Sequence, residues 1–124
     1  MLTTLATVVA GLLGAGLILM GANAFVRPRD AVGFGIPGAP VEDLGFQSWL
    51  RVKGLREIGP GVFLFVLMAV ASSSVLGWYL LVFGLIPAGD ALVVLRSGGP
   101  KATAYGVHAS TSAVMLLTGV GLLV

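Results

Sequence analysis

The chain has 124 residues, of which 57% are hydrophobic and 10% are charged, and its formal net charge is +2. Soluble domains carry roughly a quarter charged residues, so this composition argues against a water-soluble fold and indicates one membrane domain over residues 1–124. The absence of cysteine excludes disulfides and thiolate chemistry. The cations flank hydrophobic stretches and form no groove, so we expect membrane lipids and not nucleic acid as partners.

The first hydrophobic span covers residues 2–26 and contains no charged side chain. It exceeds the ~20 residues that a helix needs to cross a bilayer. Its Ala6, Ala10 and Gly14 are spaced by four residues, which is typical of a close contact between membrane helices. The span lacks a basic start and is too long for a signal peptide, so we expect it to be retained.

Three further spans follow, and we expect helices over about residues 46–70, 75–95 and 102–124. The connection 27–45 is polar and rich in Gly and Pro, and its Gly-Phe-Gly-Ile-Pro stretch is interpreted as a turn. All seven Lys and Arg residues lie in or beside this connection and the 96–101 turn. The positive-inside rule then places both connections in the cytoplasm. The predicted fold is an all-α, four-transmembrane-helix bundle in the plasma or inner membrane, with both termini on the non-cytoplasmic side.

Ionisable residues of three helices are expected at one depth inside the cytoplasmic half. Asp90 lies six residues before Arg96, about 9 Å along a helix, and His108 lies seven residues after Lys101, about 10 Å. The second helix carries Arg56 and Glu57 just past its charged opening turns. Because a charge within hydrocarbon is costly unless it is paired or hydrated, we expect these groups to converge.

This convergence predicts a site with acid–base chemistry. We expect His108 to act as general acid or base, Asp90 to orient it and stabilise its charge, and Tyr105 to donate a proton or a hydrogen bond. Arg56 is the candidate anchor for an anionic or carbonyl oxygen, with Glu57 and Arg51 of the same helix as further ligand-binding candidates. A single imidazole argues against a metal centre, and no cofactor is expected.

Simpler interpretations of the same residues stay open. Glu57 can merely pair with Lys53 at the i,i+4 spacing. Arg56 can extend to lipid headgroups. Asp90 can be a structural counter-ion. His108 can hydrogen-bond between helices through Tyr105 or a carbonyl group.

Three stretches of the chain resemble a known family. They are Arg51-Val-Lys-Gly-Leu-Arg-Glu-Ile-Gly-Pro-Gly61, Ile86-Pro-Ala-Gly-Asp90 and Val107-His108. Together they look like the domain-of-unknown-function family 4267, which is similar in plan to DoxX-like small four-helix integral membrane proteins. The resemblance implies that Arg56-Glu57-Ile58 matches the family's Arg-acid-Ile motif, although an Asp is the more frequent acid there. It implies no activity.

Three functions are compatible with the sequence. The first is a cytoplasm-facing Arg/Asp/His pocket that binds, or converts by acid–base chemistry, a small lipophilic molecule. The second is an accessory or structural membrane subunit whose charged layer docks a partner. The third is a proton-coupled transporter, which the few polar groups of the outer half make less attractive. Four short helices bury little surface, so homo-oligomers are also expected.

Overall fold

The computed structural model describes residues 1–124 as helices joined by short connections, without a β-strand, which confirms the all-helical prediction. The elements are α1 (Leu2–Val26), the 3₁₀ helix η1 (Pro28–Phe34), α2 (Leu44–Val70), α3 (Ser73–Phe83), α4 (Leu85–Arg96), α5 (Lys101–Thr103), the π-helical segment η2 (Ala104–Ala109) and α6 (Ser110–Leu123).

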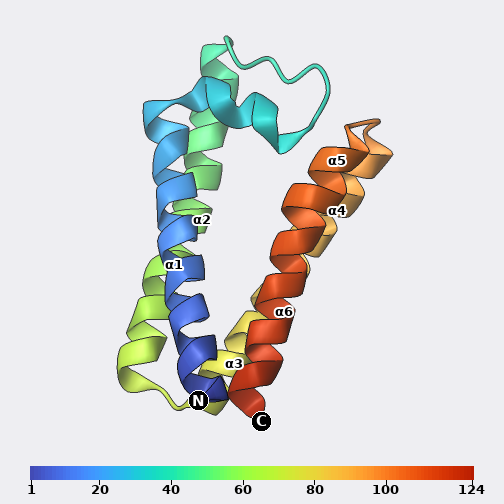
Figure 1. The fold of residues 1–124 in the computed structure, drawn as a ribbon. Coiled ribbons are helices and arrows are strands. Elements are labelled where there is room, and N and C mark those ends of the chain that lie inside the picture. The colour runs from blue at the N-terminus through green and yellow to red at the C-terminus, as the bar shows by residue number, and fades with distance from the viewer.

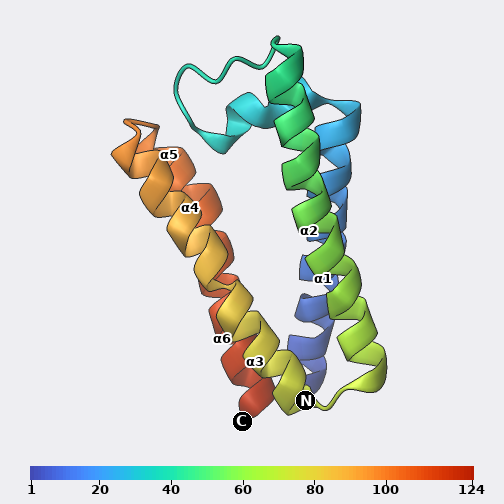
Figure 2. The ribbon, with the colours of Figure 1, turned by 180° about the vertical axis from the view of Figure 1, so that it is seen from behind.

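The helices form two arms that meet near the chain termini and diverge toward the opposite end, as Figures 1 and 2 show. The N-terminal arm consists of α1 and α2, which pack antiparallel along their length. The C-terminal arm consists of α3 and α4 packed against α5, η2 and α6. The arms contact each other mainly through α1 with α6 and α2 with α3, so the molecule has a closed end at the termini and an open end opposite.

Glycines set the close approach of α1 and α2. A Cβ atom on Gly54 would lie 2.5 Å from the carbonyl oxygen of Gly21, and one on Gly61 would lie 2.8 Å from that of Gly14. On α1, the small residues Ala6, Ala10, Gly14 and Gly21 are the buried ones. The predicted four-residue seam is therefore the buried face of α1, because small side chains let the two backbones come together.

The C-terminal arm is joined in the same way. Gly77 and Gly119 face each other, and a Cβ atom on either would lie 2.9 Å from the other's carbonyl oxygen. The buried Ser112 hydroxyl donates to the carbonyl of Gly84 over 2.6 Å. Gly84 separates α3 from α4, so this bond ties α6 to the joint between those two helices.

The hydrophobic core lies at the closed end, where both arms contribute to it. Its buried members are Ala6, Ala10, Leu64, Leu67, Leu76, Leu80, Met115 and Leu122. Large apolar side chains also cover much of the outer surface, among them Leu5, Leu12 and Leu19 of α1. A helix that is apolar on every side needs an apolar solvent when it is not buried in protein.

Three helical stretches are long and apolar enough to cross a membrane. They are Leu2–Val26, Ser73–Arg96 and Lys101–Leu123. The remaining long helix, α2, carries Arg51, Lys53, Arg56 and Glu57 in its first half, and its uncharged part begins only at Ile58.

Candidate functional site

The segment between α1 and α2, residues 27–43, is called the connecting loop here. It extends across the open end and contacts the C-terminal arm before returning to α2 (Figure 1). Gly35 is buried at that contact with φ +99°, and a Cβ atom there would lie 2.9 Å from Thr103 and 3.1 Å from Val94. The left-handed backbone and the lack of space both favour glycine. The Gly-Phe-Gly stretch is thus a tertiary contact as well as a turn.

His108 holds the connecting loop from the other side. Its Nε2 lies 2.8 Å from the carbonyl oxygen of Phe34, and the imidazole and phenyl ring centroids are 4.4 Å apart. His108 as a whole residue is only 7% exposed. His108 therefore joins η2 to the connecting loop through both a hydrogen bond and a ring contact, so it does bond to a carbonyl, but to one 74 positions away in the chain.

Lys53 and Glu57 lie on the α2 side of the same region. The Lys53 ammonium forms an ion pair with the Glu57 carboxylate, so the i,i+4 pairing that the sequence allowed is present. The Lys53 Nζ also lies 4.9 Å from the centroid of the Phe34 ring. A cation over an aromatic face is attracted by the ring quadrupole. The Phe34 ring is therefore in contact with Lys53 of one arm and His108 of the other.

Asp90 on α4 is half-buried and has neither an ion pair nor a hydrogen bond to a side chain. Lys53 and His108 are the ionisable groups near enough to act on its charge. Asp90 thus lies near His108, as the sequence predicted, although no hydrogen bond or ion pair joins the two side chains.

A cleft of about 600 Å³ opens beneath the connecting loop. It is bounded by α1, the connecting loop, the first half of α2 and the His108 side of η2. Apolar and aromatic side chains such as Phe34, Phe46 and Trp49 supply most of its wall, and Lys53, Glu57 and His108 supply polar groups. Mostly apolar walls with a few polar groups are typical of sites for small organic molecules.

The other predicted site residues lie away from this cleft. Arg56 is exposed, and its Nη1 donates to the carbonyl of Val52 on its own helix over 3.3 Å. Arg51 is also exposed. Successive residues of a helix point about 100° apart, so Arg56 cannot share the direction of Glu57.

Tyr105 is 58% exposed although His108 is buried. The residues between them form the π-helical segment η2, whose i→i+5 hydrogen bonds place more residues in each turn than an α-helix does. In η2 the buried residues are Ala104 and His108. Residues three positions apart point farther from each other in a π-helix than in an α-helix, so Tyr105 and His108 do not share a face.

Phe34 and Lys53 contact the site residues His108 and Glu57, and the sequence did not single them out as functional. Phe34 contributes its carbonyl group and its ring, and a carbonyl group leaves no trace in a sequence. The available signal was the pair of glycines around Phe34, because glycine is favoured where a backbone approaches another closely.

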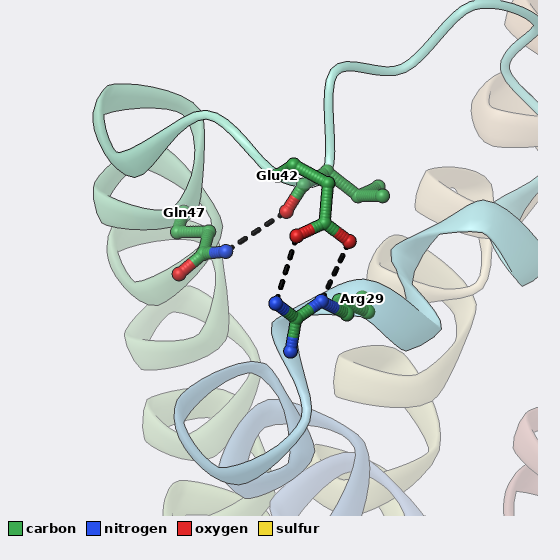
Figure 3. A network of polar contacts seen from close by, with 4 residues as sticks. Arg29, Glu42 and Gln47 are labelled. Atoms are coloured by element: carbon green, nitrogen blue, oxygen red, sulfur yellow. Dashed lines mark hydrogen bonds and ion pairs between the residues drawn. The ribbon is translucent and has the colours of Figure 1, made fainter.

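A surface ion pair closes the connecting loop on itself (Figure 3). The Arg29 guanidinium donates to both carboxylate oxygens of Glu42, over 2.6 and 2.7 Å, and Gln47 donates to the carbonyl of Val41 over 2.9 Å. The hydrogen bond from Arg29 lowers the pKa of the Glu42 carboxyl and raises the pKa of the guanidinium. Both side chains are 69% exposed, so the pair orders the loop more than it stabilises the fold.

No three His, Asp or Glu side chains are grouped so that they could hold a metal ion. Some polar groups of the cleft contact one another or Phe34: Lys53 pairs with Glu57, and both Lys53 and Nε2 of His108 contact Phe34. The ionisable groups on the wall of the cleft are an imidazole, an ammonium, a guanidinium and two carboxylates.

The fold defines an all-helical membrane protein with a cleft at one end of the helices. The model of the family described as Domain of unknown function (DUF4267) matches residues 14–122, and the chain belongs to this family. That range includes every residue of the cleft. Comparison with curated proteins gives no match, and neither does comparison with solved structures.

Proposed function

We propose that the chain crosses the cell membrane four times, with both termini outside and the cleft facing the cytoplasm. The position of α2 supports the fourth crossing, because α2 packs antiparallel along α1, which is itself long enough to span. The charged first half of α2 then lies level with the connecting loop, where all seven cations gather on or beside the open end. This distribution favours a cytoplasmic open end.

The function that the geometry supports best is binding of a small lipophilic molecule, with acid–base conversion as its chemistry. One observation carries this proposal, namely a mostly apolar cleft of about 600 Å³ that contains His108 and the Lys53–Glu57 pair. Ligand sites commonly enclose about 300–1,000 Å³. A lipophilic molecule can reach the cleft from the bilayer, while its polar end meets the charged groups.

His108 is the group that exchanges a proton in this proposal. When the imidazole accepts a proton it becomes positive, and the Asp90 carboxylate stabilises that charge at a distance. Lys53 is the cation placed to stabilise negative charge that develops on a ligand oxygen. Arg56 takes no part, because its side chain bonds its own helix away from the cleft.

Native mass spectrometry of protein extracted from its own membrane tests this proposal. Gly33 lines the cleft, its backbone is not left-handed, and a Cβ atom there has no neighbour within 4 Å. Gly33→Leu should therefore fill the cleft without strain and remove a retained small molecule. The matched control is Gly16→Leu, which adds the same side chain at an equally open position on the outside of α1. Equal retention by both variants would refute the site.

A structural subunit is the second candidate, favoured by the way the polar groups satisfy one another. Lys53 is paired with Glu57, and His108 is bonded to Phe34, as expected of a lock between the arms. This alternative predicts that His108→Leu and Lys53→Met lower thermal stability together and leave the retained molecule unchanged. Loss of that molecule from a variant of undiminished stability contradicts it.

A further inference from the structure

We infer that the cleft selects an uncharged lipophilic alcohol or phenol, whose hydroxyl group donates a hydrogen bond to Nδ1 of His108. The inference rests on the proposed function and specifies the chemical class of its ligand. It follows from the two ring nitrogens of His108 and from the charges around them.

The contact between His108 and Phe34 fixes the roles of the two nitrogens. A backbone carbonyl oxygen only accepts hydrogen bonds, so the nitrogen 2.8 Å from it must carry the hydrogen. In a neutral imidazole only one nitrogen is protonated. Nε2–H therefore donates to Phe34, and Nδ1 is left as an acceptor.

Nδ1 has no partner within the protein, because the contact with Phe34 is the only hydrogen bond of the His108 side chain. No buried side-chain nitrogen or oxygen lacks a hydrogen-bond partner, so Nδ1 is not sealed inside the protein. His108 lines the cleft. An accessible acceptor beside an apolar space suits a ligand that brings a hydrogen-bond donor.

The surrounding charges favour a neutral donor. The cleft wall carries charges of both signs, so a charged ligand would meet a like charge as well as an opposite one. The charges on the wall balance, because two cations and two carboxylates line the cleft, namely Arg27, Lys53, Asp30 and Glu57. A ligand therefore has no net charge to neutralise. A hydroxyl group on an apolar body meets these conditions.

Two probes that differ only in the donor test the inference. We would measure para-octylphenol and its methyl ether by equilibrium dialysis against the whole protein in nanodiscs. The phenol should bind about threefold to tenfold more tightly, because the ether cannot donate the hydrogen bond. In His108→Leu the two probes should bind equally.

Nitrogen NMR supplies an independent measurement that does not depend on a variant. His108 is the only histidine, so ¹⁵N-histidine labelling reports this ring alone. At a pH where the imidazole is neutral, the hydrogen should reside on Nε2, and the phenol but not the ether should shift the Nδ1 resonance. A hydrogen on Nδ1, or an Nδ1 resonance that ignores the phenol, overturns the inference.

The outcomes separate this inference from the proposed function. Equal affinity of both probes, with both lost in Gly33→Leu, keeps the lipophilic site and overturns the hydroxyl selectivity. Failure of both probes to bind, or binding that Gly33→Leu leaves unchanged, overturns the proposed function itself. Preference for the phenol that disappears in His108→Leu supports both.

Discussion

Replacing Gly54 by Ala tests whether close backbone packing of α1 and α2 fixes the wall of the cleft. The new Cβ atom would lie 2.5 Å from the carbonyl oxygen of Gly21 and 3.0 Å from Cβ of Ala24, whereas ordinary contacts begin at 3.4 Å. Both close neighbours belong to α1, so the helices must separate by about 1 Å. Such overpacking costs about 1–3 kcal/mol.

Gly16→Ala is the matched control, because it lies on the partner helix α1 with nothing within 4 Å of its Cβ atom. Both variants gain the same helix propensity, about 1 kcal/mol, so the difference between them isolates the clash. We expect Gly54→Ala to unfold at lower denaturant concentration than Gly16→Ala in reversible SDS titrations followed by circular dichroism. Equal midpoints would mean that the two helices are not held by this contact.

Three further predictions concern the loop and the C-terminal arm. Because Arg29 lowers the pKa of Glu42, the folded state favours the ionised carboxylate. At neutral pH the melting temperature of the wild type should therefore be slightly higher than that of Glu42→Gln. This difference should vanish as the pH falls through the lowered pKa of Glu42. Ser112→Ala loses the hydrogen bond to Gly84 and should lower the unfolding free energy by about 1 kcal/mol in SDS titrations. Phe34→Leu loses its ring contacts and should accelerate amide hydrogen exchange in its own loop.

Each of these variants has a control. High salt should shrink the Glu42→Gln difference, because the pair is exposed. Thr111→Ala removes a hydroxyl that bonds only its own helix, so stability equal to that of Ser112→Ala would argue against the interhelical bond. Val32→Leu changes an exposed residue of the connecting loop, and exchange as fast as in Phe34→Leu would show that the ring contacts do not hold it.

The sequence predicted the helical architecture well because hydrophobic length and small-residue spacing are local signals. The buried seam of α1 could be read directly from Ala6, Ala10 and Gly14. The divergence of the two arms could not be predicted, because the spacing of small residues identifies the buried face of a helix but not the helix that packs against it. The helix pairs are set by glycines that meet across the chain, such as Gly21 with Gly54 and Gly77 with Gly119.

The candidate site was predictable only in part. The i,i+4 pairing of Lys53 with Glu57 follows from helix geometry alone. The hydrogen-bond partner of His108 could not be predicted, because it is a main-chain carbonyl in a loop that was interpreted as a turn. Shared depth along three helices brought Arg56 into the predicted site, but depth does not determine direction around a helix axis, and Arg56 points elsewhere.

The closed and open ends differ in what holds them, and this difference predicts which end loosens first. The closed end combines the glycine contact between α3 and α6 with the hydrophobic core, so it acts as a fixed joint. At the cleft, Gly35 packs against the C-terminal arm, and Phe34 adds one hydrogen bond and one ring contact with His108 and one cation–π contact with Lys53. The three contacts of Phe34 contribute about 0.5–1.5 kcal/mol each, or a few kcal/mol together. Because Gly35 is the only buried residue of the connecting loop, we expect amide hydrogens of the loop to exchange faster than those of the helices at the closed end.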